Sequence, residues 1–64
     1  MKATTLRKVK KGDVFKFRPT EKASVWVRDD YDRETKKFGY YDFFNIGRWN
    51  ERKGDCIVYI GFEF

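Results

Sequence analysis

The sequence predicts a small all-β domain, for which we expect an SH3-like barrel of roughly four or five antiparallel strands. Three observations support this class. Apolar and polar side chains alternate with a period of two in several short segments, separated by turn residues every eight to twelve positions or so. No segment is long and periodic enough for a stable amphipathic helix. Barrel closure would hide the sheet edges, and an OB-like barrel or an open meander sheet is the alternative.

The length of 64 residues lies near the lower limit for one hydrophobic core, so we expect a single domain. Cys56 is the one cysteine and there is no histidine, which excludes an intramolecular disulfide and a Cys/His zinc site. We expect Cys56 to be a buried core residue. Seven Phe, four Tyr and two Trp supply the bulk for the core instead.

The first eleven residues are interpreted as a basic lead-in segment, ahead of a barrel domain over residues 12–64. Leu6 and Val9 lie three positions apart, so one helical turn or a lead-in segment would place both on the core. Gly12-Asp13 then indicates a turn, because glycine tolerates positive φ and aspartate bonds to nearby backbone amides.

The first barrel strand is expected around Phe15 and Phe17, which point inward, while the alternating Lys16 and Arg18 point outward. Further strands are expected over residues 24–28, 37–44 and 56–64, with a polar loop over 29–36 and a clear turn over 51–55. Residues 46–50 are either a short fourth strand or a bent continuation of the third. The last strand alternates and places Cys56, Val58, Ile60, Phe62 and Phe64 on one face.

Several short motifs together resemble those of a group of small uncharacterised proteins of bacteria and their phages. These motifs are Leu6-x-x-Val9-Lys10-Lys11-Gly12-Asp13-x-Phe15, Val25-Trp26-Val27-Arg28, Tyr31-Asp32-Arg33 and Gly54-Asp55-x-x-Val58-Tyr59-x-Gly61-Phe62. The Gly-Asp entry into the first strand is also similar to that of many SH3-like barrels. The resemblance implies a small β-fold of unassigned role.

The residue types argue against an enzyme. Without histidine no Ser/His/Asp or Cys/His arrangement can form, and Cys56 has no base to generate its thiolate. The carboxylates of residues 29–34 lie in one polar loop among basic residues, which favours a solvated loop over a catalytic pair. The loop opens like an EF-hand, but Thr35 and Tyr41 stand where glycine and a bidentate Glu are needed. We therefore expect no catalytic residues, metal, cofactor or small-molecule substrate.

The net charge of +5 is unevenly distributed along the chain. Residues 1–12 carry five basic and no acidic side chains, whereas residues 13–64 carry ten of each. We expect a flexible basic arm on a neutral body, and such an arm would bind polyanions weakly. No segment is apolar enough to cross a bilayer and no apolar signal core follows Met1, so we expect a cytoplasmic protein without a membrane partner.

Exposed rings interleaved with basic side chains suggest a non-enzymatic module that binds nucleic acid, since small barrels stack bases on rings while basic side chains track phosphates. The candidate residues are Trp26, Arg28, Tyr31, Arg33, Tyr41, Arg48 and Trp49, with Arg7, Lys8, Lys10 and Lys11 on the arm. The neighbours Trp26/Arg28 and Arg48/Trp49 are the most suggestive. Alternatively, the rings fill the core, or they form a surface for a protein partner or a homodimer.

Overall fold

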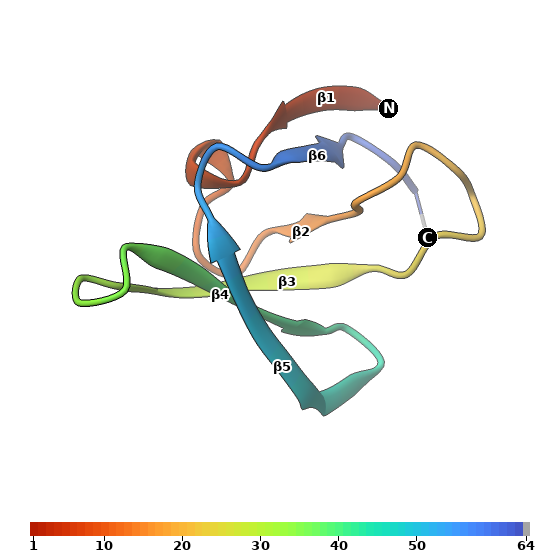
Figure 1. The fold of residues 1–64 in the computed structure, drawn as a ribbon. Coiled ribbons are helices and arrows are strands. Elements are labelled where there is room, and N and C mark those ends of the chain that lie inside the picture. The colour runs from red at the N-terminus through yellow and green to blue at the C-terminus, as the bar shows by residue number, and fades with distance from the viewer. Residues whose placement is uncertain (64) are drawn as a thin grey trace.

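The computed structural model describes residues 1–63 and confirms the all-β class (Figure 1). Its elements are β1 (Lys2–Thr5), the 3-10 turn η1 (Leu6–Lys8), β2 (Val14–Phe15), β3 (Trp26–Asp32), β4 (Lys37–Asp42), β5 (Asn45–Lys53) and β6 (Ile57–Ile60). Within the described residues no helix is long and apolar enough to cross a membrane.

The strands form two antiparallel sheets that do not close into the expected barrel. One sheet has the order β2-β3-β4-β5, which is an open meander, and the other pairs β1 with β6. Lys16 and Tyr59 join the sheets through reciprocal backbone hydrogen bonds of 2.9 and 2.8 Å. In Figure 1 β5 starts at the end of the molecule away from the β1–β6 pair and runs toward it, and its outer edge pairs with no strand of the described chain.

Two expected boundaries are wrong at the carboxyl side of the chain. Residues 51–53 were expected in a turn but belong to β5, and the turn starts at Gly54. The last strand is confined to Ile57–Ile60, and Phe64 lies outside the described residues. Its alternation is confirmed, because Val58 is fully buried while Ile57 is 53% exposed.

The core lies between the two sheets and consists of Leu6, Val9, Phe15, Tyr40 and Val58. Half-buried side chains that include Cys56 pack around it. Lys16 was expected to point outward but is 2% exposed. Strand β2 ends before Lys16, and its Nζ donates to the carbonyl oxygens of Thr20 (3.1 Å) and Glu21 (3.3 Å), which satisfies the buried ammonium.

The amino-terminal residues belong to this packing and do not form a free arm. Strand β1 pairs with β6 from Lys2↔Ile60 to Thr5↔Ile57. The amide of Leu6 then donates to the carbonyl oxygen of Cys56 (2.9 Å), and the amide of Arg7 donates to the carbonyl oxygen of Gly54 (3.0 Å). The basic side chains that follow β1 therefore start from an ordered backbone.

We predict that Leu6→Ala lowers the free energy of unfolding by about 2–5 kcal/mol, because it removes a fully buried side chain and leaves a cavity. Urea unfolding followed by circular dichroism measures the change. Lys8→Ala, at an exposed position of the same turn, is the control and changes stability by less than about 0.5 kcal/mol. A loss below about 1 kcal/mol for Leu6→Ala would contradict a core that includes the amino-terminal segment.

Candidate nucleic-acid interface

Three arginines lie over aromatic rings on the inner side of the four-stranded sheet. The distances from Cζ to the ring centroid are 4.5 Å for Arg28 over Phe38, 5.5 Å for Arg48 over Trp26 and 4.4 Å for Arg52 over Phe17. Residues at alternate positions of a strand share a side, which is why Arg48 and Arg52 both lie here. We call these six residues the arginine–ring surface.

Tyr40 connects this surface to the core. Its ring is 3% exposed and makes edge contacts with Phe15, Phe17 and Trp26 at centroid distances of 5.9, 5.2 and 5.2 Å. Its hydroxyl accepts a hydrogen bond of 3.2 Å from Nε of Arg52. That bond raises the pKa of the guanidinium further, so Arg52 is charged at every physiological pH.

Positive charge on this side is only partly neutralised. Among residues 1–63 the ion pairs are Arg48–Asp42 at 3.3 Å and Lys11–Asp30 at 2.6 Å. Arg28 and Arg52 therefore have no carboxylate partner, and Nε of Arg28 is buried without a hydrogen bond. A guanidinium group without a carboxylate partner is suited to an anionic ligand through its accessible N–H groups.

Further basic side chains gather where the β3–β4 turn lies near the end of β5, and we call them the basic end: Arg7, Lys36, Lys37 and Lys53. Lys37 lies directly opposite Lys53 in the β4–β5 ladder and opposite Asp32 in the β3–β4 ladder, and alternation directs both lysines to the side of the sheet opposite to Phe38 and Arg52. Arg7 and Lys36 line a hollow of about 280 Å³ together with Tyr31, Phe38 and Gly54, which we call the Tyr31 hollow.

Gly54 allows the wall of this hollow to form. A Cβ atom at this position would lie 2.6 Å from Cε2 of Phe38 and 3.0 Å from Cβ of Arg7. Such contacts are too short for any side chain, so only glycine lets the ring and the arginine approach each other so closely. The sequence suggested Gly54 only as a turn residue.

The outer side of the sheet has the opposite charge. Trp49 is 54% exposed, lies against Gly39 and donates from Nε1 to Oδ2 of Asp29 at 3.2 Å. A hollow of about 390 Å³ beside it is lined by Asp29, Asp30, Tyr31, Asp32, Arg33, Trp49 and Glu51. Four carboxylates and one guanidinium make this side unfavourable for a phosphate backbone.

The structure thus divides the candidate residues predicted from the sequence. It brings Arg7, Arg28 and Tyr31 together around Phe38, and it places Arg48 over Trp26. Four others lie elsewhere: Trp49 and Arg33 line the acidic hollow, Tyr41 pairs with Trp49 in the ladder, and Lys11 bonds to Asp30, which raises the pKa of its ammonium. Lys8 and Lys10 are exposed, with no ion pair among the described residues.

Of the two neighbour pairs favoured from the sequence, Trp26 and Arg28 share the inner side of the sheet, whereas Arg48 and Trp49 do not share a side. Arg28 lies over Phe38 and not over Trp26, and Arg48 lies over Trp26 and not over Trp49. Adjacent residues of a strand point to opposite sides, so Arg48 and Trp49 are separated by the sheet itself. The partners come from neighbouring strands, whose register the sequence did not specify.

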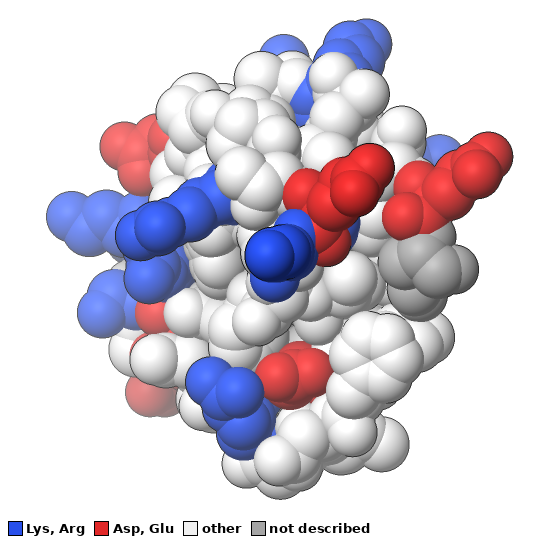
Figure 2. Space-filling model, turned by 90° about the vertical axis from the view of Figure 1, so that its right-hand side faces the viewer, with Lys and Arg blue, Asp and Glu red and all other residues white. Residues whose placement is uncertain are grey.

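Sequence reasoning missed two features. It gave no role to Lys36 and Lys37, although their position after a polar turn was a signal of charge at a hairpin end. It also missed the tip of the β4–β5 hairpin, where Phe44 and Ile46 are 77% and 75% exposed and Phe43 is 42% exposed. On the face in Figure 2, uncharged atoms cover most of the lower end, the height at which this hairpin lies in Figure 1. We call Phe43, Phe44 and Ile46 the hairpin tip.

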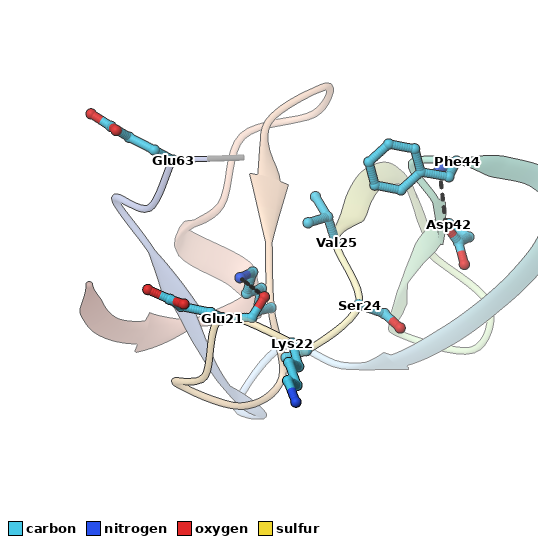
Figure 3. Close-up of a pocket in the computed structure, with 9 residues that line it drawn as sticks. Glu21, Lys22, Ser24, Val25, Asp42, Phe44 and Glu63 are labelled. Carbon is cyan, nitrogen blue, oxygen red and sulfur yellow. Dashed lines mark hydrogen bonds between the residues drawn. The ribbon is translucent and has the colours of Figure 1, made fainter.

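A hollow of about 610 Å³ lies beside this tip (Figure 3). Asp42 is 7% exposed and accepts the amide of Phe44 at 2.9 Å, which fixes the start of the turn. The walls mix basic and acidic side chains, among them Lys22, Glu21 and Glu63. Within the described residues, no group of three or more His, Cys, Asp or Glu side chains could hold a metal ion.

Comparison with known proteins gives no further guide to this site. No protein-family model, curated protein or solved structure matches the chain at a significant level.

We predict that Arg52→Met lowers the free energy of unfolding by about 0.5–1.5 kcal/mol, because it keeps the apolar stem but removes the hydrogen bond to Tyr40. A double-mutant cycle with Tyr40→Phe, measured by urea unfolding, isolates the coupling between the two side chains. Arg33→Met, at an exposed position, is the control. Additive effects of the two substitutions would show that the bond does not stabilise the fold.

Proposed function

We propose that the chain is a non-catalytic module that binds nucleic acid through the basic end and the arginine–ring surface. The single observation that carries this proposal is the group of basic side chains at the basic end, which have no ion pair among residues 1–63 and of which Arg7 and Lys36 line a hollow with the rings of Tyr31 and Phe38. Rings and unpaired cations side by side are what a strand of nucleic acid requires, since bases stack and phosphates attract cations.

The basic end is costly for the fold itself. Like charges directly opposite each other in an antiparallel ladder are destabilising, and Lys37 and Lys53 are such a pair, although Asp32 lies opposite Lys37 on its other side and offsets part of the repulsion. Lys36 has a φ of 59°, a left-handed conformation that glycine or asparagine adopts with less strain. Two unfavourable local features thus add positive charge at one place, which supports a role in binding an anion.

The charge of the two sides gives the proposed contact an orientation. Anionic groups are attracted to the inner side and to the basic end, whereas the carboxylates around Trp49 repel them from the outer side. A nucleic acid would therefore cross the rings of Phe38 and Trp26 and avoid Trp49.

We predict that Lys37→Gln with Lys53→Gln weakens binding to oligonucleotides and lowers the slope of log K against log[salt] by about 1.4 for a single strand, if each lysine meets one phosphate. The same double variant changes stability by less than about 1 kcal/mol, because it removes both the repulsion between the lysines and the attraction of Lys37 to Asp32. Fluorescence anisotropy at two salt concentrations and urea unfolding measure the two effects.

The matched control is Lys2→Gln with Lys22→Gln, which removes the same charge from exposed positions away from the basic end. It leaves the affinity nearly unchanged. Equal losses in the two double variants would mean that only the net charge matters, and no binding by the unaltered protein at low salt would end the nucleic-acid proposal.

A second candidate function, association with a protein or with a second copy, is favoured by the hairpin tip. Phe44 and Ile46 expose more apolar surface than scattered single residues do on a soluble monomer, and they are neighbours in space and sequence. Rings at the tip of a hairpin are suited to fill a pocket of another protein.

For this candidate we predict that the sedimentation coefficient rises with protein concentration and that Phe44→Ser abolishes the rise without loss of fold. Analytical ultracentrifugation makes the measurement, and Ile57→Ser, which removes an exposed apolar side chain from β6, is the control. A monomer at every concentration would exclude self-association as the role of the tip.

A further inference from the structure

We infer that the Tyr31 hollow holds one unpaired base and its phosphate, so that the preferred ligand is a single strand and not a duplex. This inference rests on the proposed nucleic-acid function and adds the class of ligand and the subsite. It stands on four features of the hollow: the bulge that places Tyr31, the exposed ring, the conformation of Lys36 and the position of Arg7.

The bulge in β3 places Tyr31 on the same side as Arg28. The register of β3 against β4 changes between Arg28↔Tyr40 and Tyr31↔Phe38, so β3 has one extra residue there. Without it, two residues three positions apart would point to opposite sides of the sheet. A bulge that redirects a side chain is a common device next to binding sites. Here Arg28 and Tyr31 both contact Phe38.

The ring of Tyr31 is available for stacking. It lies 4.6 Å from the centroid of Phe38 at an interplanar angle of 45°, and the residue remains 42% exposed. Phe38 supports the ring while solvent reaches the remainder of it. A base that stacked there would replace water against an aromatic surface, which is the sequence-tolerant contact of single-strand binding proteins.

Lys36 supplies a cation from a strained backbone position. Its amide donates to the carbonyl of Asp32 at 2.8 Å, which closes the turn, and its φ of 59° is the left-handed conformation in which glycine is favoured. The side chain lines the hollow beside Tyr31. A lysine kept where glycine would relieve strain indicates a requirement for its charge.

Arg7 supplies the second cation, and its position is fixed from both sides. Its amide is bonded to the carbonyl of Gly54, and its side chain packs against that glycine next to Phe38. One ring and two cations around a hollow of about 280 Å³ match a nucleotide with its base on the ring and its phosphate between Arg7 and Lys36. In a duplex, the base faces are stacked on each other and cannot reach Tyr31.

The test compares a fluorescently labelled single-stranded DNA, the same sequence as RNA, and the corresponding duplex, each titrated with the full chain at low salt. We expect a preference for the single strands. Tyr31→Ala is expected to weaken single-strand binding by about 5- to 100-fold, the range found for loss of one stacked base, and to leave duplex binding within about twofold. Trp49→Ala, which removes an exposed ring from the acidic side, is the matched control. It is expected to change neither single-strand binding nor duplex binding.

Lys36→Gly provides a second readout that a purely structural role would not produce. It is expected to raise the thermal midpoint while it weakens single-strand binding, because the strain and the cation are removed together. If Tyr31→Ala fails to fold, Tyr31→Leu and Lys36→Gly still decide the question.

The outcomes separate the inference from the proposed function. Equal affinity for single strand and duplex, or full single-strand affinity in Tyr31→Ala, would overturn the subsite while nucleic-acid binding stands. A protein that binds neither form at low salt would remove the proposed function, and the inference with it. A difference between DNA and RNA would show whether the sugar hydroxyl contributes.

Discussion

The contacts of one tyrosine join the strands of the four-stranded sheet on the side that faces the core. Tyr40 packs its ring against three other rings and receives the guanidinium of Arg52 at its hydroxyl. The two sheets do not close into a barrel through hydrogen bonds, so side chains cover the open side of the core. Arg52 does so over Phe17, and Arg48 does so over Trp26. The inner side of the four-stranded sheet, where these arginines cover the core, is therefore also the side that carries their positive charge.

Local features of the chain were predictable from the sequence. The inward position of Phe15, the pair of anchors Leu6 and Val9, and the inward position of Val58 follow from the spacing of apolar residues, and all four side chains are buried. The buried position of Lys16 was not predictable, because it depends on where β2 ends and on carbonyl groups several residues later. Alternation says which side a residue faces only while the strand continues.

Most of the candidate site depends on information that no single segment contains. The arginine–ring contacts join neighbouring strands, so they follow from register, and one bulge residue in β3 reverses the side on which Tyr31 lies. The net charge of each segment was misleading, because it does not show which side of the sheet each charged residue faces. Residues 13–64 carry equal numbers of acidic and basic side chains, yet folding separates them into an acidic side around Trp49 and a basic end.

The pairing of β1 with β6 has a kinetic consequence. Lys2 lies opposite Ile60, so one of the two sheets forms only when nearly the whole described chain has been brought together. The meander of β2 to β5 is joined by local turns, whereas the β1–β6 contact requires the closure of a long loop, which slows folding. During synthesis, β1 leaves the ribosome first and has no strand to pair with until β6 follows. Until then, Leu6 remains in solvent and the core is incomplete.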